Sequence, residues 1–426
     1  MQTRTVAGFL VWVIAVVLSM APPPARAVSG TLDNVPGATL LLPYFEVDLA
    51  NPNGITTLFT INNASATATL ANVTLWTDAG VSSYSFNVYF TGYDMQSINV
   101  RDLFNGTLPI TASAGQDPAD QISPKGPLSQ DINFASCAGI LPYTNPLPQP
   151  LIDDLRAMHT GQPIPSGQTP RCAGTSFGDQ IARGYITVDT RNACSADVHP
   201  DDPAYAPLLT QQDVFTGDFQ IVHPAMNFAQ GEVMPALERI LLPQGGYSFY
   251  GAFSNGFASS PREPLPTHWG VPHAASEASH RNSDVVVWRD RKRAVTDFAC
   301  DAGAQLNVAS EAILHNDATG ERVATATNGQ SVPLATQRHP VLTGTDFSGD
   351  IIRVPAKSGW LDVDLNHDQP QANPYGGVAQ SYIFGVMSSQ GRFSAAVPGV
   401  QLDAAATFTP QPPPKQAAAA SQEDRP

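Results

Sequence analysis

The sequence predicts an all-β protein built from two β-sandwich domains in tandem, and three observations support this. Residues 183–190 (RGYITVDT) and 358–365 (SGWLDVDL) share Gly, an aromatic residue, an aliphatic residue, Val and Asp in one register. Similar segments flank the two copies in the same order: 97–103 (SINVRDL) and 350–356 (DIIRVPA) before them, and 218–224 and 381–387 after them. Only 14% of residues are charged, whereas 38 are Pro and 33 are Gly, which favours turn-rich β structure over helices.

Side-chain alternation explains what the repeated pattern does. In an extended strand Tyr185, Thr187 and Asp189 share one face, while Ile186 and Val188 share the other. The second copy has the same division into a polar and an aliphatic face. We therefore expect the two segments to be equivalent strands of duplicated units.

The N-terminus has the pattern of a secretory signal peptide. Arg4 precedes an apolar run at 9–20, and a small-residue cleavage site follows that ends at Ala27. The run is too short to span a bilayer comfortably, and no later segment is apolar enough to do so. We expect residues 1–27 to be removed and the mature protein, from Val28, to be exported to the periplasm or outside the cell.

The first sandwich is predicted over residues 28–230. Short segments that alternate apolar and polar residues are separated by turn residues, at 38–47, 55–63, 72–78, 84–90 and 97–103. With 183–190 and 218–224 they make seven strands, the number typical of an immunoglobulin-like sandwich. The stretch between them, 105–180, is rich in Pro, Gly, Ser and Gln and is predicted as an irregular insertion with one helix at 151–159.

The rest of the chain divides into a connector, a second domain and a tail. Residues 231–283 are predicted as the connector, with a short helix in EVMPALERILL, and residues 284–403 as the second immunoglobulin-like sandwich. Its expected strands lie at 284–290, 305–317, 321–327, 350–356, 358–365 and 381–387. Residues 404–426 have little apolar content and are predicted to be a disordered tail.

Four cysteines fit an oxidising location outside the cytoplasm, and they allow three disulfide pairings. Cys137–Cys172 is favoured because both residues lie in the irregular insertion, and it leaves Cys194–Cys300. The spacings match no zinc pattern such as C-x-x-C.

The best candidate metal site is a calcium site in DVDLNHD, formed by Asp362, Asp364, Asn366 and Asp368. If the chain turns after Asp364, these oxygens converge on calcium, which takes six to eight such ligands. The Gly and the distal Glu of a calcium loop are missing. The alternative is a polar strand face that runs into a surface turn.

Two weaker sites lie in the connector. His273, Glu277 and His280 would share one helix face and bind zinc together with His268 or His223, unless the segment is a solvated linker. Aromatic residues between 247 and 257 would stack on sugars, unless alternation buries them in a core.

No enzyme motif accompanies these sites. The chain has no G-x-S-x-G, no H-E-x-x-H, no Walker loop and no G-x-G-x-x-G after a strand, so no catalytic residue and no organic cofactor are predicted. A net charge of -15 argues against nucleic acid as a partner, because a polyanion is repelled.

Four phrases carry a resemblance: LLPYFEVDLANPNG, FNVYFTGYDMQSINVRDLFNG, GDFQIVHPAMNFAQGE and REPLPTHWGV. They are similar to a group of uncharacterised exported Gram-negative bacterial proteins with immunoglobulin-like β-sandwich domains. This resemblance implies secretion and β-rich structure, and it assigns no catalytic residue.

The function expected from these features is that of an exported, non-catalytic binding or structural module at the cell envelope or beyond, with a protein or glycan partner. One alternative is a secreted hydrolase whose site lies in the insertion or the connector. Another is a calcium-stabilised carbohydrate-binding protein. The sequence fixes neither the partner nor the oligomeric state.

Overall fold

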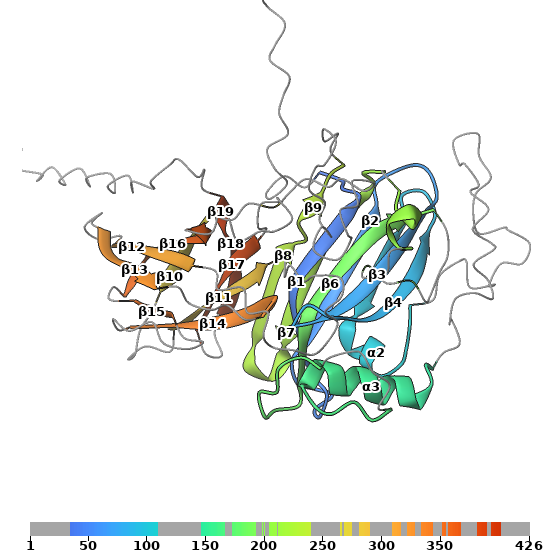
Figure 1. Ribbon diagram of the computed structural model, residues 1–426, viewed down its shortest axis with the longest axis horizontal. Coiled ribbons are helices and arrows are strands. Elements are labelled where there is room, and N and C mark those ends of the chain that lie inside the picture. The colour runs from blue at the N-terminus through green and yellow to red at the C-terminus, as the bar shows by residue number, and fades with distance from the viewer. Residues whose placement is uncertain are drawn as a thin grey trace, which may run out of the picture.

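The computed structural model describes residues 35–109, 146–166, 173–192, 198, 200, 204–210, 212–239, 265, 268–274, 281–289, 309–316, 322–328, 334–343, 352–354, 357–367, 381–389 and 393–401. These residues form four β-sheets and two short α-helices, so the all-β prediction is confirmed (Figure 1). No helix in this part of the chain is long and apolar enough to cross a bilayer.

The first unit contains two antiparallel sheets that face each other. Sheet I has the strand order β4 (Ser82–Phe90), β3 (Thr69–Thr77), β6 (Ile181–Arg191), β1 (Thr39–Asp48), β9 (Ala236–Leu237). Sheet II has the order β5 (Met95–Asn99), β2 (Thr56–Asn63), β7 (Phe215–His223), β8 (Phe228–Val233). In β7 the buried residues alternate with more exposed ones, as expected for a strand with one face in the core.

The second unit also contains two sheets. Sheet III has the order β15 (Ile352–Val354), β14 (Thr336–Thr343), β11 (Arg281–Arg289), β17 (Ser381–Ser389), β18 (Phe393–Pro398). Sheet IV has the order β13 (Arg322–Asn328), β12 (Ala309–Asn316), β16 (Ser358–His367), β10 (His268–Ala274), β19 (Val400–Gln401). All pairings are antiparallel except that of β14 with β15.

Strand order shows that the two units repeat one topology. Sheet IV matches sheet I strand for strand when β10 is equated with β1, β12 with β3, and β16 with β6. Residues 183–190 and 358–365 therefore occupy the same central position, as predicted from the sequence. Their registers agree too, since Asp189 is opposite Thr39 on β1 and Asp364 is opposite His268 on β10.

Three details of the predicted repeat are wrong. Of the segment SINVRDL (97–103), only 97–99 lie in a strand, at the end of β5, because Asn99 caps helix α2 (Val100–Phe104) by accepting a hydrogen bond from the Arg101 amide. Sheet order equates β5 with β14, which the sequence analysis missed, and not with 350–356. β14 was missed because its central residues, Arg338, His339 and Pro340, lack the apolar alternation of a half-buried strand.

The predicted connector is shorter than 231–283. The segment expected to form a helix carries the end of β8 and β9, while β10 and the start of β11 belong to the second unit. By contrast, the helix predicted at 151–159 is confirmed as α3 (Gln149–Thr160). Pro150 lies in its first turn, and Gly161 ends it in the left-handed conformation, with φ of 67°.

Sheet III packs on both faces. Ser381 on β17 accepts a hydrogen bond from the Trp269 indole of sheet IV, whereas Phe384 on the opposite face of β17 meets Phe219 of sheet II with ring centroids 5.8 Å apart. Residues 285–288 of β11, three valines and a tryptophan, are accordingly all buried. A strand covered on both faces reads as a continuous apolar run instead of an alternating one.

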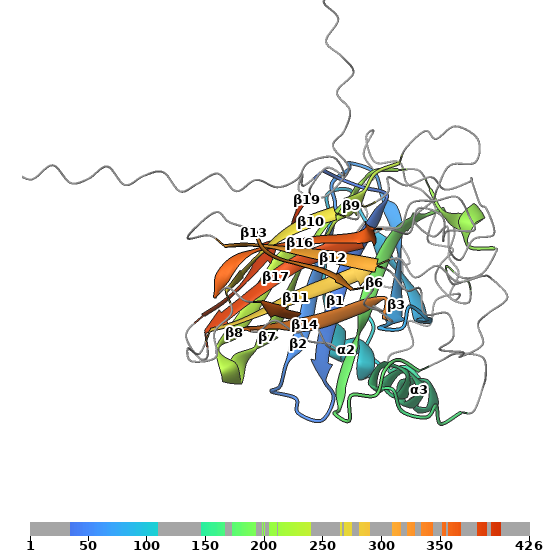
Figure 2. The same cartoon turned by 60° about the vertical axis from the view of Figure 1, so that its left-hand side comes forward.

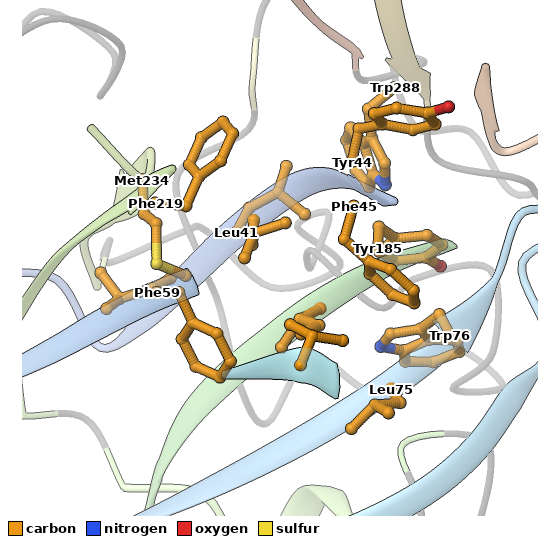
Figure 3. Close-up of a cluster of buried hydrophobic side chains, with 14 of the residues drawn as sticks. Leu41, Tyr44, Phe45, Phe59, Leu75, Trp76, Tyr185, Phe219, Met234 and Trp288 are labelled. Carbon is orange, nitrogen blue, oxygen red and sulfur yellow. The ribbon is translucent and has the colours of Figure 1, made fainter. Parts of the chain in front are cut away.

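The second unit thus closes an open side of the first, and the apolar cores of both units form one continuous cluster. Figure 3 shows Trp288 of β11 beside Tyr44 and Tyr185 of the first unit. The Trp288 and Tyr185 rings are 5.9 Å apart in an edge-to-face arrangement. Figure 2 shows the strands of the second unit lying alongside β1, β7 and β8.

A chain of alternating charges crosses the junction between the units. Arg338 of β14 donates to Asp284 at 2.8 Å and lies 3.3 Å from a Glu46 oxygen of β1. Arg183 of β6 lies 3.7 Å from the other Glu46 oxygen and binds Asp179 at 2.8 Å. Burial alone would lower the pKa of both arginines, but the neighbouring carboxylates outweigh it and raise the pKa above the usual value. Glu46 is therefore held by one arginine from each unit.

Candidate functional site

The predicted calcium ligands lie on a regular strand. Asp362, Asp364 and Asn366 belong to β16, which remains extended as far as His367, so the chain does not turn after Asp364 as the calcium loop requires. Asp362 is buried, opposite Gly270 of β10, and Asp368 lies outside the described residues. Calcium binding by these four residues stays a prediction, but the turn that was expected to bring them together is not present in β16.

The other predicted sites are only partly visible. Cys137, Cys172, Cys194 and Cys300, and with them both disulfides, lie outside the described residues, as do Glu277, His280 and the aromatic residues at 247–257. His273 lies on β10 and not on a helix, so the proposed zinc-binding helix face is wrong. Burial lowers the pKa of His273 to about 4. Within the described ranges no three His, Cys, Asp or Glu residues cluster as metal ligands do.

A serine–histidine pair, which the sequence analysis missed, lies where α3 packs against sheet I. Ser83 of β4 and His159 of α3 are joined by a 2.7 Å contact between Oγ and Nε2. His159 Nδ1 is 2.9 Å from the main-chain oxygen of Arg183. The His159 ring also packs against Phe45 and Phe104. The only sequence signal for this pair was a histidine on the predicted helix of the insertion.

The hydrogen bonds fix the tautomer of His159. A carbonyl oxygen only accepts, so Nδ1 carries the proton and Nε2 of the neutral ring accepts. The single hydrogen of the Ser83 hydroxyl is shared between Nε2 at 2.7 Å and the Leu75 main-chain oxygen at 3.1 Å. Burial lowers the pKa of His159 to about 4, which keeps the ring neutral near pH 7. A nucleophile, a base and an orienting acceptor are thus arranged as they are in serine hydrolases.

Burial argues against catalysis by this pair. Ser83 is 1% exposed and His159 is 2% exposed, and the Ser83 hydroxyl is also within 3.1 Å of the Leu75 main-chain oxygen. A substrate carbonyl would have to reach the hydroxyl through the packed interface of α3 with sheet I. The arrangement attaches the helix to the sheet, and the bond from Arg156 Nε to the Phe104 oxygen at 2.9 Å attaches it to α2.

A second buried polar group lies on the outer face of sheet I. Asp189, on the repeated strand, accepts from the hydroxyls of Thr39 and Tyr205, each at 2.5 Å. The Arg191 guanidinium lies 4.7 Å from the centre of the Tyr205 ring. Burial and the Asp189 carboxylate raise the pKa of Tyr205, so it stays a hydrogen-bond donor. This network holds residues 204–210 against the sheet.

The outer face of sheet II is the exposed surface most suited to a partner. Its outward residues are Thr56, Leu58, Thr60, Asn62, Met95, Ser97, Asn99, Thr216, Asp218, Gln220, Val222, Ala229, Gly231 and Val233. Asp218 is the single ionisable residue among them, in a protein with a net charge of -15. Met95 is 63% exposed, Val233 43% and Leu58 37%. We call these fourteen residues the sheet II face.

An exposed aromatic residue borders the sheet II face. Tyr93 is 74% exposed and has a φ of 56°, which non-glycine residues adopt rarely. Its turn is fixed by the bond from the Tyr93 amide to the Ser65 oxygen and by the Asp94 carboxylate, which accepts from the amides of Thr91 and Met95. The fold thus presents this ring to solvent in a strained but well-braced conformation.

Comparisons with known proteins add nothing to these observations: no family model, no curated protein and no solved structure matches the chain.

Proposed function

We propose that the chain is an exported, non-catalytic binding module, made of two copies of an immunoglobulin-like sandwich, that binds a partner protein through the sheet II face. The observation that carries the proposal is the exposure of Leu58, Met95 and Val233 on a nearly uncharged face. Methionine and aromatic residues are enriched in protein interfaces, and charged residues are depleted at their centres. The Tyr93 ring beside Met95 adds such an aromatic contact.

The character of the face also favours a flat, neutral partner. Hydroxyls on adjacent strands already bond to each other or to amides, as Thr56 does to Asn99 at 2.8 Å. These groups keep the surface rigid, and a partner covering it would displace water without burying several unpaired charges.

The test introduces charge into the face. Leu58→Lys and Met95→Lys should each weaken capture of a partner from envelope extract at least tenfold, because a lysine at the centre of an interface must be desolvated. Val400→Lys is the matched control, since Val400 is 40% exposed on β19 of the second unit. A photo-cross-linking residue at Thr60 identifies what is bound. Equal capture by all variants contradicts the proposal.

A glycan is the other partner class expected from the sequence, and the same variants distinguish it. Protease treatment of the extract abolishes capture if the partner is a protein and leaves it intact if the partner is a polysaccharide. Capture that survives protease would move the function to carbohydrate binding and would count against the proposal.

A hydrolase is the second candidate, and the Ser83–His159 pair is the observation that favours it. A fluorophosphonate probe forms a phosphorus–oxygen bond with an activated serine and releases fluoride. We expect no adduct at Ser83, because the hydroxyl is buried. Ser83→Ala should instead destabilise the fold by about 1–3 kcal/mol, since it leaves Nε2 of His159 without its donor. If peptide mapping finds the fluorophosphonate attached to Ser83 in the wild type, and finds no labelling in Ser83→Ala, the protein is a hydrolase and the non-catalytic function is wrong.

A further inference from the structure

Asp78 connects three parts of the molecule. It lies in the turn between β3 and β4, and its carboxylate accepts from the amide of Thr175, which follows α3, at 3.0 and 3.3 Å. Its main-chain oxygen accepts from the amides of Ala335 and Thr336, at the start of β14, at 2.7 and 3.2 Å. One residue therefore contacts the insertion through its side chain and the second unit through its backbone.

The space around the Asp78 carboxyl is closed. Asp78 is 3% exposed, and a Cβ placed on Gly174 would lie 2.2 Å from Asp78 Oδ1. Gly174 is itself fixed by the bond from its amide to the Met158 oxygen of α3 at 2.7 Å. Any side chain at position 174 would displace the segment 173–175 from Asp78.

No cation is dedicated to this carboxyl among the described residues. Arg183 on β6 is the charged group that acts on it, and Arg183 is already bound to Asp179 and close to Glu46. The other groups that act on the carboxyl are the amide and the side chain of Thr175 and the amide of Ala79. β14 contributes backbone amides, to the main-chain oxygen. The ionised form is therefore buried with hydrogen bonds but with little opposite charge.

We propose that Asp78 is a proton-operated clasp, which holds residues 173–175 and the start of β14 against the first unit when it is protonated and releases them when it is ionised. A protonated carboxyl still has an oxygen that accepts from the Thr175 amide, and because it carries no charge, burial costs it little hydration free energy. An ionised carboxyl is better hydrated when the segments around it open.

The direction follows from the proton equilibrium. Burial raises the pKa of Asp78 to about 6, whereas an exposed aspartate has a pKa near 3.9. The closed form binds the proton more tightly, so its stabilisation is complete at acidic pH and is lost as the pH rises through about 6. Between pH 5 and pH 7.5 the population of the open form should rise about tenfold.

Amide hydrogen exchange of the full mature chain tests the clasp. After correction for the intrinsic pH dependence of exchange, the amides of Thr175, Ala335 and Thr336 should exchange about tenfold faster at pH 7.5 than at pH 5 in the wild type. In Asp78→Asn this pH dependence should vanish, because the side-chain amide oxygen still accepts from the Thr175 amide but the group does not titrate.

The matched control is Asp102→Asn, which removes an exposed carboxylate from α2 and should keep the wild-type response. Exchange with no pH dependence at these three amides in the wild type would overturn the clasp, as would an unchanged pH dependence in Asp78→Asn.

Discussion

Replacing Phe384 by alanine is expected to lower the free energy of unfolding of both units together, by about 3–5 kcal/mol. The side chain is fully buried on β17, and its ring packs edge to face against Phe219 of the first unit. Because the two cores are continuous, its loss should shift one common transition. Calorimetry and urea unfolding of the mature protein measure the change. If the curves instead show two transitions, and Phe384→Ala shifts the midpoint of the second unit but not that of the first, the units unfold independently.

A double-mutant cycle separates the contact from general destabilisation. Phe219→Ala and Phe384→Ala should be non-additive by about 0.5–1.5 kcal/mol, the range measured for aromatic pairs. Ile383→Ala is the matched control, because Ile383 is equally buried on β17 but lies on its other face. The cycle of Phe219 with Ile383 should be close to additive.

The second large effect is expected at Arg338. Arg338→Met leaves Glu46 and Asp284 at a largely buried junction without the cation that joins them, and we expect a loss of about 2–4 kcal/mol. The Arg338 side chain is 20% exposed, so solvent screening keeps the loss below that of a fully buried pair.

Neutralising the carboxylates tests the cause of that loss. The triple variant Arg338→Met, Glu46→Gln, Asp284→Asn also removes the Asp284 charge, which has lost its cation, and the Glu46 charge, which keeps only Arg183. It should recover at least half of the lost stability in urea unfolding. If the triple variant is as unstable as Arg338→Met alone, the loss comes from packing of the arginine stem, including its contact with Phe228, and not from charge.

Local patterns predicted the strands well where residue types alternate along the chain, even when both faces of the strand are buried. The segment 183–190 was recognisable as a strand and as a repeat because its polar and aliphatic residues alternate, although residues 184–190 of β6 are all buried. β14 was not, since the polar residue Arg338 at its centre is placed by its contacts with Glu46 and Phe228 of the first unit. The alternation of apolar and polar residues along a strand reflects which of its faces is in the core of its own unit. It does not show where another unit packs against that strand.

The candidate sites were harder to predict for the same reason. Ser83 and His159 are far apart in sequence, and neither belongs to a motif, so only the fold brings them together. The calcium prediction assumed a turn that the pairing of β16 with β10 and β12 does not allow. The sheet II face was invisible because exposure of Leu58 and Met95 depends on which face of each strand is outward.

The position of β17 and β18 late in the chain has a consequence for synthesis. The open side of the first unit, with Phe219, is covered by strands that end only at residue 398, whereas β9, the last strand of that unit, ends at residue 237. At usual translation speeds this interval lasts roughly 8–30 s. During that time the side of the first unit that sheet III covers stays exposed, so the nascent chain is open to association through this apolar surface until its C-terminal strands emerge.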